Sequence, residues 1–151
     1  MTILDGKNVS AQVKERVKNE ALNLKNQGIE PALAVILVGE DKASQTYVAA
    51  KEKACIACEI KSVMHRLPES TTQSELIALI DDGIDGILVQ LPLPKHIDTN
   101  KILETISPEK DVDGFAAINV GKLASGLDGF VPCTPLGIME IFKAYDINLE
   151  G

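Results

Sequence analysis

The sequence contains no tryptophan, and phenylalanine and tyrosine together account for only 3 % of its 151 residues. Its core must therefore be built from aliphatic side chains, which is typical of buried parallel strands covered by helices. Hydrophobic residues make up 45 % of the chain and charged residues 25 %, a balance that is typical of a globular protein. The length suits one domain, and we find no internal repeat.

Basic residues are also few, and they never form a run. The formal net charge is −7 at pH 7, so the surface should repel the phosphate backbone of nucleic acids, and we expect no nucleic-acid partner. No apolar run approaches the length of a membrane span, and the first residues lack the basic flank and long apolar core of a signal peptide. With three cysteines and no export signal, we expect a cytoplasmic protein with no membrane partner.

Motifs for nucleotides and metals are absent as well. Neither the GxGxxG motif nor a P-loop motif occurs in the chain. Cys55 and Cys58 form a CxxC motif, but no second pair completes a zinc site. The motif also comes near the end of its predicted helix, whereas a redox motif would sit at a helix N-terminus. We therefore predict no metal site and interpret both cysteines as small core residues.

The hydrophobic pattern predicts alternating helices and strands. Strands are expected at 32–38, 60–67 and 86–91, and helices at about 8–27, 44–58 and 98–106. A further helix should follow a capping box at 72–75, and the last should have Thr134 as its cap and Pro135 at its first position. Residues 111–115 form an edge strand or a turn, and 121–129 a loop with one short helical piece. This order predicts an α/β fold with three layers, α/β/α, around a short, mostly parallel sheet.

Tyr47 and Lys51 lie four residues apart in the second predicted helix, and therefore on the same face of it. This helix follows the strand that ends at Val38. The aromatic ring and the amine would then both point toward the region beyond the carboxyl end of a parallel strand, where open α/β sheets bind ligands. The alternative is an ordinary amphipathic helix with a partly buried tyrosine and a solvated lysine.

Polar residues at two further positions are candidates for a ligand site. Gln90 ends the apolar run GILVQ, where an unpaired buried amide would cost about 1–3 kcal/mol. It either satisfies local backbone or bonds to a cleft residue such as Lys51. Asp111 and Asp113 alternate, so in an extended chain both carboxylates point to one side. They belong either to a solvated turn or to a cleft in which a carboxylate accepts hydrogen bonds from a ligand.

Four segments in this order, VGEDKASQTYVAAKEKAC, GILVQLPLP, PEKDVDGF and PCTPLG, resemble the bifunctional methylenetetrahydrofolate dehydrogenase/methenyltetrahydrofolate cyclohydrolase family. The likeness covers nearly the whole chain. It implies oxidation of methylenetetrahydrofolate by hydride transfer to NADP, followed by hydrolysis of the methenyl product to formyltetrahydrofolate in the same cleft. It also implies tetrahydrofolate derivatives as ligands and, for the full-length family, a homodimer.

The resemblance also implies roles for individual residues. Lys51 matches the catalytic lysine, and Gln90 matches the glutamine that contacts and tunes it. Tyr47 matches a tyrosine that stacks on the folate, Asp113 a carboxylate that holds the pterin ring, and Ser44 a further substrate-binding position near the lysine. Elementary chemistry agrees, because a neutral amide orients an amine without adding charge and a carboxylate accepts N–H donors in pairs. A tyrosine ring offers a flat apolar face.

The chain departs from the family in two places. The family continues beyond the final LEG into a Rossmann-type domain that binds NADP, and that second domain is absent here. We therefore expect residues 1–151 to form the folate-binding catalytic domain and to lack dehydrogenase activity alone, because the hydride acceptor has no site. The segment LIDDGIDGIL looks about five residues shorter than in the family, which could cost the third helix its last turn.

Two alternatives stand beside the enzyme. One is a folate-binding module without turnover, and the other is a structural or regulatory α/β domain that binds no folate.

Overall fold

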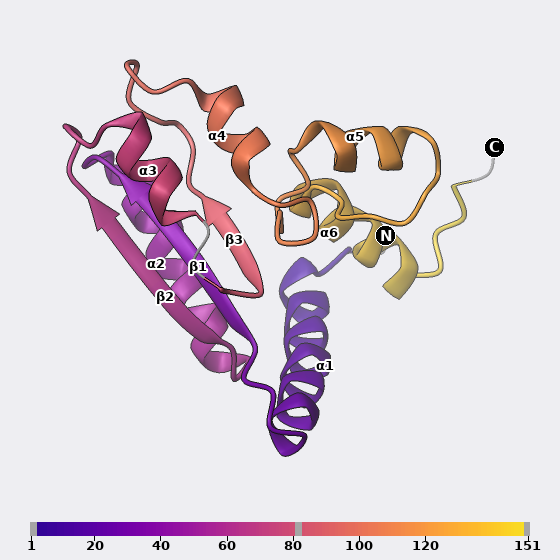
Figure 1. Ribbon diagram of the computed structural model, residues 1–151. Coiled ribbons are helices and arrows are strands. Elements are labelled where there is room, and N and C mark those ends of the chain that lie inside the picture. Colours follow the sequence, from indigo (N-terminus) through magenta and orange to yellow (C-terminus); the bar gives the residue numbers. More distant parts are fainter. Residues whose placement is uncertain (1–2, 81–82, 150–151) are drawn as a thin grey trace.

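The computed structural model describes residues 3–80 and 83–149, and a parallel sheet of three strands lies at its centre (Figure 1). The central strand β1 (Ala32–Val38) pairs with β2 (Lys61–Leu67) on one side and with β3 (Gly86–Val89) on the other. Both pairings are parallel. The predicted α/β fold with its short parallel sheet is therefore confirmed.

Helices cover both faces of this sheet, as the predicted three layers require. On one face α2 (Lys42–Ala57) packs through Val48, and on the other α3 (Gln73–Leu79) and α4 (Thr99–Thr105) close the larger core. Because side chains alternate along a strand, successive residues of β1 point alternately into the core under α2 and into the larger core under α3 and α4. The buried residues of the larger core are Ala34, Ile36, Val38, Leu76, Ile80, Ile87, Val89, Ile97, Ile102 and Ile106.

Two long helices from opposite ends of the chain pack together beside the sheet rather than over it (Figure 1). α1 (Gly6–Asn26) contacts both α6 (Cys133–Ala144) and α2. An ion pair of 3.1 Å joins Arg16 on α1 to Glu140 on α6, and the Tyr145 hydroxyl accepts a 2.8 Å hydrogen bond from the backbone N–H of Asp5. These contacts hold the C-terminal half of α6. The first residues of the same helix belong to one wall of the site described below.

Local capping signals set most helix starts. Thr72 and Glu75 form the predicted capping box of α3, and Asp98 caps α4. Asp5 accepts hydrogen bonds from two backbone N–H groups, so α1 begins at Gly6 instead of near residue 8. Asp41 likewise caps α2. α3 ends at Leu79, and the predicted short link that follows includes residues 81–82, which lie outside the described residues.

The last two helices differ from the prediction. α5 is a full helix, Ala117–Ala124, although the pattern predicted only a short helical piece after residue 121. Its N-cap, Ala116, has no side-chain cap hydrogen bond, and the backbone N–H of Ala116 donates to the carboxylate of Asp111 five residues earlier. α6 begins at Cys133, so Thr134 is not its cap and Pro135 is its third residue. Neither start is set by a side chain of the N-cap residue.

The cysteines of the CxxC motif are buried and free, Cys55 within α2 and Cys58 at its C-cap. The interpretation of both as core residues is confirmed. In residues 3–80 and 83–149 no group of three or more histidine, cysteine or acidic side chains is placed to hold a metal ion.

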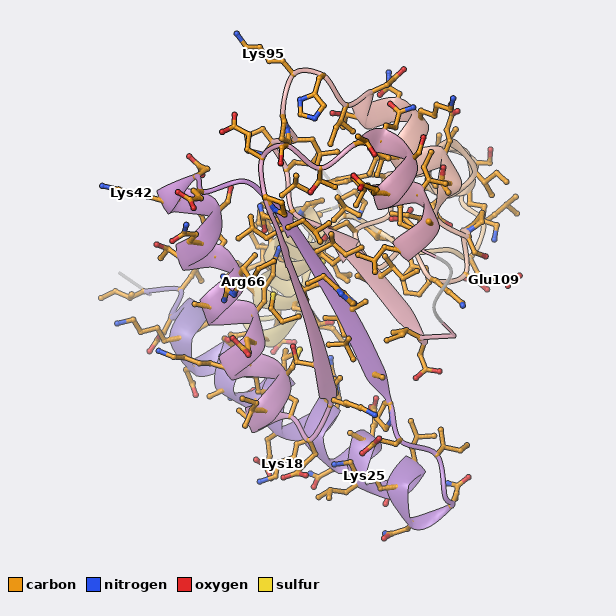
Figure 2. The ribbon with its side chains drawn as sticks, turned by 60° about the vertical axis from the view of Figure 1, so that its left-hand side comes forward. Lys18, Lys25, Lys42, Arg66, Lys95 and Glu109 are labelled. Atoms are coloured by element: carbon orange, nitrogen blue, oxygen red, sulfur yellow. The ribbon has the colours of Figure 1, made fainter. Side chains whose placement is uncertain are left out.

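The charged side chains labelled in Figure 2 point outward at several places on the molecule. The labelled lysines are spread along the molecule, from Lys95 at one end to Lys25 at the other, instead of gathering on one face. Among the described helices none has the length and apolar character needed to cross a membrane.

Candidate active site

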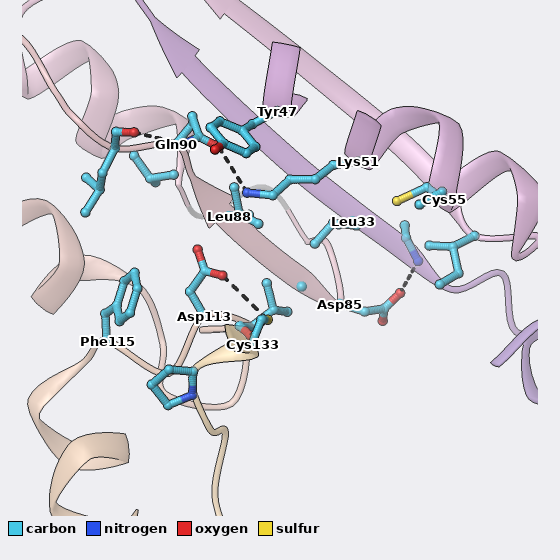
Figure 3. A pocket seen from close by; sticks show the side chains of 18 of the residues that line it. Leu33, Tyr47, Lys51, Cys55, Asp85, Leu88, Gln90, Asp113, Phe115 and Cys133 are labelled. Carbon is cyan, nitrogen blue, oxygen red and sulfur yellow. Dashed lines mark hydrogen bonds between the residues drawn. The ribbon is translucent and has the colours of Figure 1, made fainter. Parts of the chain in front are cut away.

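A cleft of about 1070 Å³ opens beside α2 (Figure 3). α2 packs mainly over β1 and β2, and Leu88 of β3 and Gln90, just after that strand, line the floor of the cleft. The facing wall consists of the loop after α4 and the first residues of α6, which contribute Asp113 and Cys133. A cavity of this size suits a ligand of several rings. It begins at the carboxyl end of β3, as predicted, but extends along the sheet to Asp85 at the other end.

Lys51 and Gln90 meet in this cleft. The Lys51 amine donates to the Gln90 side-chain oxygen over 3.0 Å, and the Gln90 amide nitrogen donates to the backbone oxygen of Leu91 over 2.8 Å. The backbone N–H of Gln90 also pairs with Ile36 of β1. Both interpretations of Gln90 are thus correct at once, since it satisfies local backbone with one end and contacts the lysine with the other. The amide is held so that its oxygen faces the amine.

Tyr47 lies one turn before Lys51 on α2, and both line the cleft, as their spacing predicted. The tyrosine side chain is 63 % exposed. Its ring stands at the mouth of the cleft above the amine (Figure 3). A flat ligand entering there would find one face of this ring open for stacking.

Asp113 faces Lys51 from the other side of the cleft (Figure 3), but Asp111 does not. Asp111 is 2 % exposed and accepts hydrogen bonds from the backbone of Ala116 at 2.8 Å and from the Asn119 amide at 3.0 Å. The prediction that both carboxylates point to one side is therefore wrong. The chain turns between Asp111 and Gly114, which are joined by a 3.0 Å backbone hydrogen bond, so the alternation of an extended strand does not apply.

Burial raises the pKa of the Asp113 carboxyl above its ordinary value of 3.8. The positive charge of Lys51 and a hydrogen bond from Cys133 act in the opposite direction, whereas the negative charge of Asp111 raises the pKa further. A carboxyl that is partly desolvated forms stronger hydrogen bonds with a donor than an exposed carboxyl does. The cleft therefore offers a strong acceptor to a ligand that brings N–H groups.

Ser44 lies in the first turn of α2, away from the cleft lining. It is 3 % exposed, and its backbone N–H donates to the Asp41 carboxylate over 2.7 Å. Hydrogen bonds from the backbone and the side chain of Ser44 lower the pKa of Asp41. The surroundings of Ser44 are those of a residue that holds the start of the helix carrying Tyr47 and Lys51.

Cys133 is the cleft residue that the sequence did not single out as functional. Its thiol lies 3.8 Å from an Asp113 carboxylate oxygen, although the two residues are twenty positions apart. Their proximity depends on the packing of α6, which no local pattern reveals. The one feature of the sequence that could have pointed to Cys133 is the PCTPLG segment, which carried part of the family resemblance.

Replacing Gly114 with alanine should destabilise the wall that carries Asp113. Gly114 has φ +66°, and a Cβ there would lie 2.7 Å from the Phe130 backbone oxygen. Gly126 is the matched control, because it has φ +68° with open space around it. Chemical denaturation of Gly126→Ala should show only the cost of the left-handed backbone, about 1–2 kcal/mol, and Gly114→Ala should cost more. Equal losses in the two variants would mean that the close approach is unimportant.

Together these features define an α/β domain with a cleft in which an amine, an amide and a half-buried carboxyl converge. Residues 4–113 match the family described as tetrahydrofolate dehydrogenase/cyclohydrolase, catalytic domain. The chain belongs to this family.

Relatives agree with this assignment in sequence and in structure. The bifunctional protein FolD of Campylobacter fetus is 75 % identical over 100 % of this chain and 55 % of its own length. A crystal structure of the bifunctional FolD enzyme from Campylobacter jejuni is 58 % identical, with a TM-score of 0.96 over 100 % of this chain and 56 % of that one. A Trypanosoma brucei FolD structure, complexed with NADP cofactor and inhibitor, is 34 % identical, with a TM-score of 0.91 over 99 % and 54 %.

The chain spans about half the length of the relatives it matches. The alignment with the Campylobacter fetus protein extends over 156 residues, against 151 in this chain. This difference agrees in size with the predicted shortening of the link before β3.

Proposed function

We propose that residues 1–151 act as the folate-binding catalytic domain of a one-carbon enzyme, which oxidises methylenetetrahydrofolate with NADP and hydrolyses methenyltetrahydrofolate to formyltetrahydrofolate. Membership of the family supports folate derivatives as the ligands. The observation that carries the proposal is the contact between Lys51 and Gln90, which faces the half-buried carboxyl of Asp113 across one cleft. The arrangement supports the proposed roles of Lys51 in proton transfer and of Asp113, on the opposite wall, in anchoring the substrate.

In the proposed hydrolysis, water adds to the methenyl carbon and one carbon–nitrogen bond then breaks. The product is a formyl group on one nitrogen, and one proton is released. Lys51 can take the proton from the attacking water or give one to the nitrogen that leaves. Gln90 holds the amine in place through a neutral contact, so it adds no negative charge beside the group that must exchange protons.

The remaining cleft residues would bind the folate. Asp113 would accept hydrogen bonds from the amino-pyrimidinone edge of the pterin, and the open ring face of Tyr47 would stack on the substrate. Ser44 does not line the cleft, so we propose that it acts indirectly by holding the first turn of α2 in place.

NADP is proposed as the hydride acceptor of the whole enzyme, and it supplies oxidation when bound. The described residues of this chain do not fit its diphosphate. Phosphate groups are usually held by a glycine-rich loop at the start of a helix. The loop between β1 and α2 has one glycine, Gly39, followed by Glu40 and Asp41, whose charges would repel phosphate. We therefore assign no part of the hydride transfer to these residues.

A folate-binding module without turnover would account for Tyr47 and Asp113 but not for the contact between Lys51 and Gln90. The enzyme is therefore the better explanation.

Calorimetry with tetrahydrofolate tests the binding half of the proposal. Tyr47→Ala should weaken binding about tenfold, because loss of an aromatic contact costs about 0.5–1.5 kcal/mol beyond the buried area. Tyr47→Phe keeps the ring and should bind as the wild type does. Absence of heat with the wild-type chain, or equal affinities for all three proteins, would contradict the proposed cleft.

A homodimer and a cytoplasmic location stay predictions for this chain. The homodimer rests on the family resemblance, and the cytoplasmic location rests on the use of cysteine. Light scattering at several protein concentrations would decide the oligomeric state.

A further inference from the structure

The Cys133 thiol is placed beside the carboxyl group on which the proposed folate binding depends. Its sulfur lies 3.8 Å from Asp113 Oδ1 and 3.7 Å from the Val112 backbone oxygen, both within reach of a thiol donor. A thiol has one proton, so it donates to one of these oxygens at a time. The contact leaves the second carboxylate oxygen of Asp113 for a ligand.

Backbone packing holds this contact in place. Gly114, the residue after Asp113, passes so close to Phe130 and Val131 that a Cβ would collide with their backbone. Cys133 follows two residues later as the first residue of α6. The loop that carries Asp113 and the helix start that carries Cys133 are therefore packed directly against each other.

The charges around the contact favour a thiol that acts as a donor and not as a nucleophile. Burial, and then the negative charge of Asp113, raise the pKa of the Cys133 thiol. It therefore keeps its proton at neutral pH. Three groups act on the charge of Asp113: Lys51 of α2 and Cys133 of α6, and the Asp111 carboxylate of the same loop, which acts by its negative charge although it points elsewhere. Of these three, Lys51 and Cys133 stabilise its ionised form.

We propose that Cys133 is a positioning residue, whose thiol donates to Oδ1 of Asp113 and so directs the other oxygen toward the N–H groups of the ligand. This proposal rests on the proposed function for the nature of the ligand. The contact between the thiol and the carboxylate itself does not depend on it.

The first experiment needs no folate. The Asp113 carboxyl carbon is followed by NMR as a function of pH in the wild-type chain, in Cys133→Ala and in Cys133→Ser, with Asp113→Asn to assign the signal. Loss of the donor should raise the pKa of Asp113 in Cys133→Ala, and serine, which keeps a hydroxyl donor, should bring it back toward the wild-type value. Alanine also admits more water, which would lower that pKa. A rise therefore reports the hydrogen bond, and an unchanged or lower pKa overturns the proposal.

The second experiment measures tetrahydrofolate affinity by calorimetry in the same proteins. Cys133→Ala should bind about fivefold more weakly and Cys133→Ser within about twofold of the wild type, as expected for one hydrogen bond. If the wild-type chain binds no folate, the proposed function fails, while the NMR comparison still decides the role of Cys133. If folate binds and the alanine variant matches the wild type in both experiments, the role of Cys133 is refuted on its own.

Discussion

Replacement of Lys51 with methionine should lower the rate of methenyltetrahydrofolate hydrolysis by at least about 100-fold, because a positioned acid or base contributes about 10²–10⁴ to a rate. Methionine keeps an unbranched apolar stem in the cleft and removes only the amine. The loss of the methenyl absorbance with time measures the effect. Tetrahydrofolate affinity should change much less, since Tyr47 and Asp113 remain.

Lys53→Met is the matched control for this variant. Lys53 is an exposed residue on the same helix, outside the cleft lining, so its replacement should leave the rate unchanged. A Lys51→Met variant that keeps more than about a tenth of the wild-type rate would remove the amine from the mechanism. A wild-type chain that binds folate but hydrolyses nothing would instead favour the binding module.

Asp113→Asn should weaken tetrahydrofolate binding about 30-fold, because hydrogen bonds to a charged group contribute about 1.5–3 kcal/mol. The same variant should be more stable than the wild type at neutral pH. Burial raises the pKa of Asp113 in the folded chain, so the folded state holds this proton at pH values where the unfolded state has lost it. The stability of the wild type therefore falls as pH rises above the ordinary aspartate value of 3.8 and up to the raised one.

Urea denaturation at several pH values tests this second effect. The gain in Asp113→Asn should be present at pH 7 and should vanish below the ordinary aspartate pKa, where the wild-type carboxyl is neutral in both states. Asp128→Asn, on an exposed loop, removes one charge without a buried site and should show no such gain. A loss of stability in Asp113→Asn at pH 7 would mean that the attraction of the positive charge of Lys51 outweighs the cost of burying the Asp113 carboxylate.

Local patterns predicted the elements whose signals lie within a few residues. The apolar run 32–38 became β1 with the predicted bounds, and the capping box placed the start of α3. The four-residue spacing of Tyr47 and Lys51 placed both in the cleft. Such features depend on strand and helix periods and on short-range hydrogen bonds, which residue order alone specifies.

Contacts outside the helix and strand periods account for what was missed. At the turn and at the start of α5, the buried Asp111 carboxylate accepts hydrogen bonds from the Ala116 backbone and the Asn119 amide, and neither donor can be identified by spacing. The family resemblance matched Asp113 to a ligand-binding position. The residue pattern alone did not distinguish a solvated turn from a carboxylate in a cleft. The position of Cys133 beside Asp113 depends on the packing of α6, and no local sequence pattern predicts it.

The order of the residues by itself determined an aliphatic α/β domain, the pairing of Tyr47 with Lys51 on one helix face, and the family. The tertiary structure alone decided which polar groups meet, because convergence in a cleft depends on the packing of α2, β3 and α6 and not on the periodicity of any one of them. It separated Asp113 from Asp111, placed Ser44 outside the cleft lining, and brought the Cys133 thiol to the carboxyl that the folate is proposed to bind.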